Sequence, residues 1–189
     1  MAGVLAASLL IPGTAQARGF SLFNGGSTTI TESSFGDDGT ACKNGCTGHT
    51  FTGKQSKIYV VSGEHTLKFN GVTIDKGTFS AGQDTEAVRI GAGATVHLEL
   101  SGKNKIIGGK NTPGIIVPKD ATLEISAGSL DDELTASTYR GDDASGAAGI
   151  GGGSYDNTNE IGKIIINGGT ITATGRGSGN FPGIGTNKS

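Results

Sequence analysis

The stretch AVRIGAGATV, residues 87–96, can be laid over GIIVPKDATL, residues 114–123, without a gap. In each stretch a short apolar run is followed by a turn and then by the beginning of a second apolar segment. Similar second segments recur along the chain, and each alternates apolar and polar residues before it reaches glycine: HTLKFNG from His65, ATVHLELSG from Ala94, ATLEISAG from Ala121 and GKIIINGG from Gly162. Alternation with a period of two is typical of half-buried β-strands. The chain is therefore predicted to be an imperfect repeat of short strands.

The repeat units begin at residues 87, 114, 149 and 183, and each holds about three short strands. One unit cannot bury its apolar face alone, so the units must stack with each strand beside its counterpart in the next unit. This predicts an all-β fold, a parallel β-helix (β-solenoid), which the general rule for parallel crossovers makes right-handed. Two inward columns are expected, one of Leu67, Val96, Leu123 and Ile164 and the other of Phe69, Leu98, Ile125 and Ile166.

Gly-Ile-Gly occurs twice, in AAGIGGG at residues 147–153 and in FPGIGT at residues 181–186. We interpret each copy as a one-residue strand in which Ile150 or Ile184 points into the core, while the flanking glycines turn the chain. A phosphate-binding loop would need a strand before it and a helix after it. The residues that follow, Ser154 to Asn157, do not begin a helix, so the structural interpretation is favoured.

The two ends of the chain differ from the repeat. Residues 1–17, MAGVLAASLLIPGTAQA, are uncharged and end in an Ala-x-Ala motif. They predict a signal peptide and an exported protein, with a buried N-terminal strand or helix as the alternative; the apolar run is too short to span a bilayer. Residues 18–57 do not repeat and are expected to form an N-terminal cap over the coils of residues 58–189. Because the last unit starts close to residue 189, the chain is expected to be a piece of a longer protein or to pack its last coil on a partner.

The only cysteines, Cys42 and Cys46, lie in the loop sequence DDGTACKNGCTG. Export favours a small structural disulfide between them, and a redox-active pair is the alternative, although that chemistry usually needs C-x-x-C beside a helix. No partnering histidine pair is apparent, which argues against zinc. The three histidines, His49, His65 and His97, are far apart in sequence and are expected at the surface.

Composition excludes several classes of protein. Glycine supplies 35 residues, but there are only four prolines and no Gly-X-Y period, so the chain is not collagen-like. The formal net charge is −2, there is no tryptophan, and no basic patch is present in the sequence. Nucleic acid is therefore not expected as a partner.

The repeat resembles those of bacterial secreted and cell-surface β-helix proteins. The segments that carry this resemblance are GAGATVHLELSGKNKIIGG, GIIVPKDATLEISAGSL, AAGIGGG and GKIIINGGTITATG. These proteins are adhesin-like, and many are labelled carbohydrate-binding. The resemblance extends from about Ile58 to the C-terminus. It implies a secreted or surface-attached adhesive module whose partner is a polysaccharide or a host cell-surface glycan, or else a rigid stalk. A role in binding is favoured over an enzyme, and the sequence leaves the choice between them open.

Acidic side chains are the candidates for catalysis or for a metal. A polysaccharide lyase or glycoside hydrolase on the same scaffold is the alternative function, and its acids would be Asp131, Asp132, Asp142 and Asp143. The cluster Asp131, Asp132 and Glu133 could instead bind Ca²⁺. No other cofactor is indicated. A charged insertion between two strands is also what a solvated turn looks like.

The long loops supply the candidate ligand-binding residues, Tyr139, Arg140, Asp142 and Tyr155, which are expected to converge on one edge. Arg140-Gly141-Asp142 could also be an integrin ligand, although a three-residue motif often arises by chance. On the strands, an outward column of Lys68, His97, Glu124 and Ile165 is expected, and charge pairs between neighbouring coils explain it without catalysis. A threonine column of Thr66, Thr95 and Thr122 leaves ice binding as a further alternative.

Overall fold

A computed structural model describes residues 27–30, 46–77, 85–139, 146–152, 160–177 and 179–186. These residues form fourteen β-strands and no helix, and every pair of neighbouring strands is parallel. The strands are β1 (Ser27–Ile30), β2 (Cys46–Lys54), β3 (Lys57–Val60), β4 (Glu64–Asp75), β5 (Val88–Ile90), β6 (Thr95–Ser101), β7 (Lys103–Lys110), β8 (Ile115–Ile116), β9 (Thr122–Ala127), β10 (Glu133–Tyr139), β11 (Ile150–Gly151), β12 (Lys163–Ile166), β13 (Thr170–Thr174) and β14 (Ile184–Gly185). The prediction of an all-β fold is confirmed.

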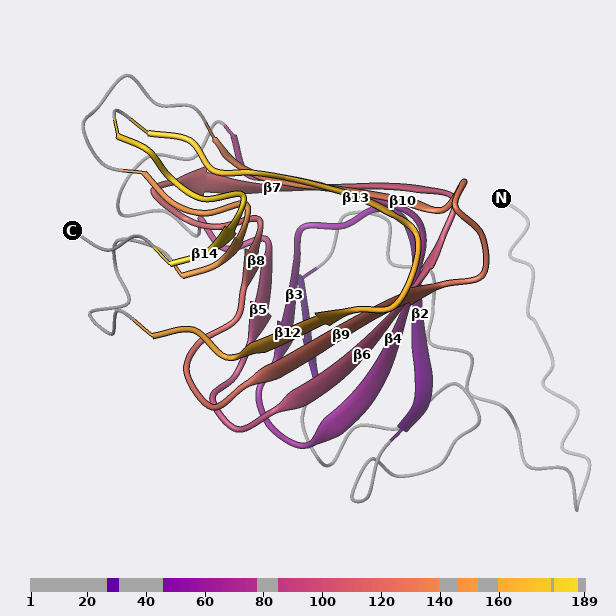
Figure 1. The fold of residues 1–189 in the computed structure, drawn as a ribbon. Coiled ribbons are helices and arrows are strands. Elements are labelled where there is room, and N and C mark those ends of the chain that lie inside the picture. The colour runs from indigo at the N-terminus through magenta and orange to yellow at the C-terminus, as the bar shows by residue number, and fades with distance from the viewer. Residues whose placement is uncertain are drawn as a thin grey trace, which may run out of the picture.

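The strands form two curled sheets (Figure 1). The first has the order β1-β3-β5-β8-β11-β14, and the second has the order β12-β9-β6-β4-β7-β10-β13, with β2 paired to β4. The second sheet bends within β4, since its residues before Gly71 pair with β6 and those after it pair with β7. The chain thus passes three faces in turn and returns to the first, which is consistent with a parallel β-solenoid. We call one such passage a coil.

The register of the coils corrects the predicted inward columns. In the structure His65 lies opposite Val96, and Leu67 lies opposite Leu98, so the first coil is displaced by two residues from the predicted alignment. The columns of the later coils, from Val96 and Leu98 onward, are as predicted. The displacement arises because the corner that ends each segment sets the register: Gly71 and Gly102 both have positive φ, 67° and 63°, and Asn70 pairs with Ser101 just before them.

The core fills the space that the sheets enclose. Its residues are mainly isoleucine, leucine and valine, with Phe51 and Phe69 in edge-to-face contact at 5.9 Å between ring centres. Leu67, Leu98 and Ile125 are at most 2% exposed. A shift of two residues keeps a side chain on the same face of a strand, which explains why Leu67 and Phe69 of the first coil were identified correctly as inward residues although their partners were not.

The Gly-Ile-Gly segments are short strands, as predicted, and Ile150 pairs with Ile184. Ile150 is fully buried. Gly151 has a φ of 133°, and a Cβ at this position would stand 2.1 Å from the carbonyl oxygen of Gly185. Ile184 is 40% exposed, because β14 is the last strand of its sheet and no described strand covers it.

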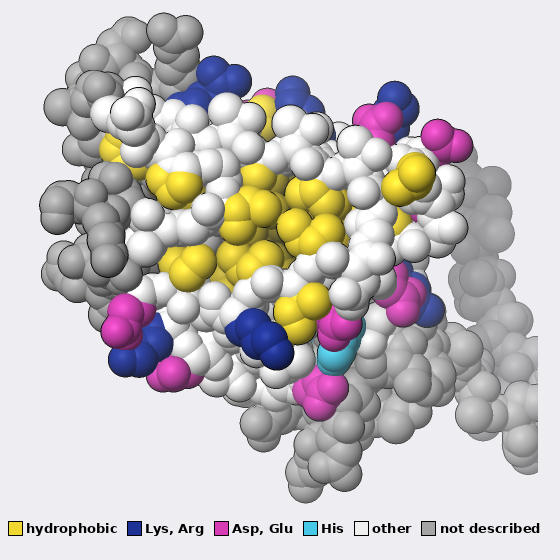
Figure 2. Space-filling model, viewed as in Figure 1, with side chains coloured by type: hydrophobic (Ala, Val, Ile, Leu, Met, Phe, Trp, Pro, Cys, Tyr) yellow, Lys and Arg dark blue, Asp and Glu magenta, His cyan; other side chains and the backbone are white. Residues whose placement is uncertain are grey.

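The last described coil leaves part of the core uncovered. Hydrophobic side chains are visible in the middle of the face framed by β12, β13 and β14 (Figure 2). Ile164, Ile171 and Ala173 are only partly buried, and Ile166 is 43% exposed. In earlier coils the equivalent residues are buried by a neighbour on each side.

Candidate functional site

A polar cluster lies on the outer face of the second sheet, centred on His97 of β6. Its Nε2 is 2.9 Å from Oε1 of Glu64, and its Nδ1 is 2.9 Å from Oε2 of Glu124. Asn167 Nδ2 donates to the other oxygen of Glu124 at 2.5 Å. The hydrogen bond to Glu64, with that to Glu124, raises the pKa of His97 above its ordinary value. With a carboxylate facing each ring nitrogen, protonated His97 can donate from both, and this arrangement favours the charged form of the ring.

The cluster also corrects the predicted outward column. His97 lies opposite Thr66 and Glu124. Lys68 lies opposite Glu99 instead, with 4.0 Å between Lys68 Nζ and Glu99 Oε2. The predicted threonine column is likewise displaced, since Thr95 and Thr122 are aligned with Glu64 and Lys163 rather than with Thr66. Both changes follow from the register of the first coil. Charge pairing between coils, which the sequence indicated, is present with different partners.

The cluster predicts a pH-dependent contribution to stability. A raised folded-state pKa means that protonated His97 contributes fully below the ordinary histidine pKa, and that the contribution is lost as the pH rises through the folded-state value. The Tm of the parent protein should therefore exceed that of His97→Gln by more at about pH 5.5 than at about pH 9, on either side of the ordinary pKa of about 6.5. The gain should stay below about 1 kcal/mol, because the side chain of His97 is only partly buried and water screens its ion pairs. Thermal unfolding of both proteins tests this, and a constant difference in Tm would contradict it.

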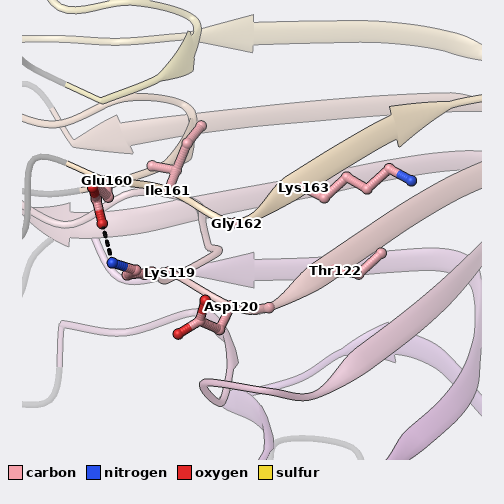
Figure 3. Close-up of a pocket in the computed structure, with 8 residues that line it drawn as sticks. Lys119, Asp120, Thr122, Glu160, Ile161, Gly162 and Lys163 are labelled. Carbon is pink, nitrogen blue, oxygen red and sulfur yellow. Dashed lines mark ion pairs between the residues drawn. The ribbon is translucent and has the colours of Figure 1, made fainter.

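A pocket of about 520 Å³ lies beside this cluster (Figure 3). Two turns form it, one before β9 and one before β12 in the next coil, joined by hydrogen bonds from Gly162 N to Val117 O and from Lys163 N to Ala121 O. Lys119 points to Glu160, and their Nζ and Oε2 atoms are 2.5 Å apart. This contact raises the pKa of Lys119. The residues that line the pocket are Lys119, Asp120, Ala121, Thr122, Glu160, Ile161, Gly162 and Lys163.

The pocket and the cluster form one continuous surface. Thr122 and Lys163 are cross-strand neighbours at the pocket, and Thr122 continues through Thr95 to Glu64 in the cluster. Lys163 extends away from the Lys119–Glu160 pair, along its strand (Figure 3). We call this surface the polar face; it consists of Glu64, His97, Lys119, Asp120, Thr122, Glu124, Glu160, Lys163 and Asn167. It offers ammonium, carboxylate, hydroxyl and amide groups on backbone that the sheet fixes in place.

The predicted acidic cluster is a hydrogen-bonded turn before β10. Asp132 Oδ1 accepts from Gly102 N at 2.7 Å, and its Oδ2 accepts from Ser129 N at 3.0 Å. Glu133 pairs with Lys103 at 3.1 Å. Asp131 is exposed. Within the described ranges, no group of three or more His, Cys, Asp and Glu residues is arranged to hold a metal ion.

The predicted loop residues are only partly described. Tyr139 ends β10 and is 43% exposed, about 20 Å along the strand from Glu133. Arg140, Asp142, Asp143 and Tyr155 lie outside the described residues, as do Cys42 and residues 1–17. Cys46 begins β2, but its predicted disulfide with Cys42 also falls outside the described part. In the part of the chain that the structure describes, there is no helix long and apolar enough to cross a membrane.

Several polar residues were missed or misplaced by the sequence analysis. His49 and His65 were expected at the surface, but they are 2% and 0% exposed. The alternation of β4 places His65 on the same face as Leu67, and this signal was available in the sequence. Asn104, in a stretch that looks solvent-exposed, is 2% exposed and forms hydrogen bonds at the bend of the second sheet.

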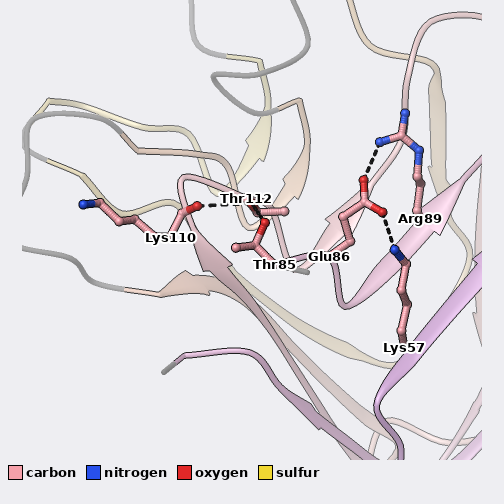
Figure 4. A network of polar contacts seen from close by, with 6 residues as sticks. All are labelled: Lys57, Thr85, Glu86, Arg89, Lys110 and Thr112. Atoms are coloured by element: carbon pink, nitrogen blue, oxygen red, sulfur yellow. Dashed lines mark hydrogen bonds and ion pairs between the residues drawn. The ribbon is translucent and has the colours of Figure 1, made fainter. Parts of the chain in front are cut away.

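A further polar network lies on the first sheet (Figure 4). Glu86 contacts Lys57 at 2.6 Å and Arg89 at 2.7 Å, so one carboxylate links two neighbouring coils. Close by, Thr112 Oγ1 donates to Thr85 Oγ1 at 2.7 Å. Since these ion pairs and this hydrogen bond join groups within the network, we interpret it as stabilising the contact between neighbouring coils.

Comparison with known proteins finds no match to this chain among family models, curated proteins or solved structures.

Proposed function

We propose that this chain is an exported adhesive module, secreted or attached to the cell surface, which binds a glycan on its polar face. The proposed scaffold is a right-handed parallel β-helix. The pocket at Lys119 and Lys163, open and lined by hydrogen-bonding side chains, is the observation that carries the proposal. If no glycan binds, the same scaffold would serve as a rigid stalk.

The scaffold is supported by the order of its strands. In each sheet a strand pairs in parallel with its counterpart from the neighbouring coil, and this order runs from β1 to β14 in the first sheet. Parallel crossovers are almost always right-handed, which supports that hand for the coils. The stack makes the outer face rigid, because each strand is hydrogen-bonded on both sides except at the ends.

The chemistry of the pocket favours a sugar over an apolar ligand. Sites for drug-like molecules are mostly enclosed and apolar, whereas this pocket has two ammonium and two carboxylate groups and the hydroxyl of Thr122. Sugar hydroxyls can donate to Asp120 and accept from Lys163. No aromatic side chain lines the pocket, so a single site should bind weakly, and several sites on one surface would supply avidity.

Binding is also favoured over catalysis on this face. A general base needs a free acceptor, and three of the four carboxylates on this face are already engaged: Glu64 and Glu124 contact His97, and Glu160 contacts Lys119. The fourth, Asp120, is the acceptor proposed for a sugar hydroxyl. Each ring nitrogen of His97 is likewise engaged by a carboxylate. The side chains therefore hold one another in place, which suits recognition of a ligand.

The test is glycan-array binding of the full chain, with and without Ca²⁺, while any release of soluble sugar is followed. Lys163→Ala should weaken binding to the best glycan by at least about tenfold, or about 1.4 kcal/mol. Lys103→Ala is the matched control, because it removes an exposed lysine from the other arm of the same sheet. Equal binding by both variants would contradict this site. Steady release of sugar would instead establish a lyase or hydrolase, and absence of any binding would leave the stalk.

A further inference from the structure

Two of the three histidines lie side by side in the core, between β2 and β4. The ring centres of His49 and His65 are 5.7 Å apart, with 44° between the ring planes. Their proximity depends on an irregularity in the pairing of the two strands. Cys46 is opposite His65, but His49 is already opposite Leu67, so β2 carries an extra residue between them. This bulge brings His49 to the inner face next to His65.

The ring of His65 is held in one tautomer and has an unused nitrogen. Its Nε2 is 2.8 Å from the carbonyl oxygen of Ser62, which can only accept, so Nε2 carries the proton. The lone pair is therefore on Nδ1. That atom is buried and has no hydrogen-bond partner among the residues that the structure describes. A buried acceptor without a donor is costly, and a ligand that fills this position would remove the cost.

This arrangement is the one that a metal-binding histidine shows. Such a histidine almost always donates its other ring N–H to a carbonyl or a carboxylate, as Nε2 of His65 does to Ser62. Two imidazoles on one ion, with metal–nitrogen distances of about 2.0–2.1 Å, have ring centres roughly 5–6 Å apart. The observed separation of 5.7 Å lies within this range. Imidazole ligands favour Zn²⁺, Cu²⁺ or Ni²⁺ over Mg²⁺ and Ca²⁺.

We propose that His49 and His65 bind one divalent cation of the Zn²⁺ class, with Nδ1 as the ligand atom of His65. Zinc seemed excluded in the sequence because no histidine pair was visible, and the fold supplies that pair. The site is inside the coils and does not depend on the polar face.

Zinc binding to the full chain, stripped of metal and kept reduced, tests the pair by competition with a chelating indicator. His65→Gln is the key variant, because the glutamine amide can still donate to Ser62 O while the Nδ1 ligand is lost. His97→Gln is the matched control, since it removes the remaining histidine. The parent and His97→Gln should bind one Zn²⁺ per chain. His65→Gln and His49→Gln should bind Zn²⁺ at least about 100-fold more weakly, because losing a direct ligand should cost at least as much affinity as the largest losses seen for a residue that only supports a ligand. Equal binding by all four proteins would overturn the proposal.

A measurement on the unmodified chain covers the case in which a variant does not fold. Paramagnetic Co²⁺, added in place of zinc, should shift the ring protons of His49 and His65 in the NMR spectrum and leave those of His97 nearly unchanged. Shifts confined to His97 would overturn the assignment to the core.

Discussion

Replacing Gly91 with alanine is expected to lower the free energy of unfolding by at least about 3 kcal/mol, equivalent to a fall in Tm of roughly 6–12 °C for a chain of this size. A Cβ on Gly91 would stand 2.0 Å from the carbonyl oxygen of Val61 and 3.0 Å from that of Val60. The amide of Gly91 also donates to Val60 O at 2.6 Å, which fixes the distance between the two backbones. Gly91 and Val61 lie on neighbouring coils inside the stack. These two coils would have to separate to admit the methyl group of alanine.

Gly128→Ala is the matched control. A Cβ at Gly128 meets only Asp132 Oδ2, at 4.0 Å, and the residue is exposed. The same substitution should therefore change stability there by less than about 1 kcal/mol. Thermal and denaturant unfolding of the two variants would measure the difference. Similar Tm values for Gly91→Ala and the parent would show that the coils are not packed as closely as described.

The second large effect is expected at Asn104, whose amide closes the bend of the second sheet. Its Oδ1 accepts from Val72 N at 2.8 Å. Its Nδ2 lies near three carbonyl oxygens, those of Ser101, Gly102 and Glu133, at 3.2–3.3 Å. One buried side chain thus satisfies backbone groups from three consecutive coils. Asn104→Asp should destabilise the protein by about 2–4 kcal/mol, because a buried carboxylate would replace the donor that faces these carbonyls.

Lys105→Ala is the control for Asn104, since Lys105 is exposed on the opposite face of the same strand. Its effect should be within about 0.5 kcal/mol. Hydrogen exchange gives a local measurement: the amide of Val72 should exchange faster in Asn104→Ala than in Lys105→Ala, beyond the change in global stability. Unchanged protection of that amide would refute the role assigned to Asn104.

Much of the fold could be predicted from the sequence because it depends on local alternation. The pattern from Ala94 to Ser101 identifies a strand and its inward residues without knowledge of any partner. Register is different, because it depends on where two strands are anchored. The predicted alignment began at the start of each segment, whereas the bends at Gly71 and Gly102 anchor the real one. The same error separated Lys68 from its true neighbour, Glu99.

The polar face could not be predicted in the same way. Its pocket joins residues 119–122 to residues 160–163. The predicted alignment of the later coils already stacks Lys163 on Thr122, as the structure does. Alternation carries no information about the turns that precede these two strands, so the pocket between the turns was not predicted. His49 was missed for a similar reason, since a bulge in β2 turns it inward. The assignments of Arg140, Asp142, Asp143 and Tyr155 stay predictions.

Because one side of β12, β13 and β14 is uncovered, local stability should differ between this end of the described stack and its middle. In a one-dimensional array each layer is stabilised by its neighbours, so a layer with a single neighbour opens at a lower free-energy cost than one between two. Among the described residues, one wall of the pocket, residues 160–163, belongs to a layer with a single neighbour, and the other wall belongs to the layer beside it, which has two. A ligand that contacts both walls would hold the two layers together. If a glycan binds at this pocket as proposed, its binding would be coupled to local folding of that layer and would reduce its opening.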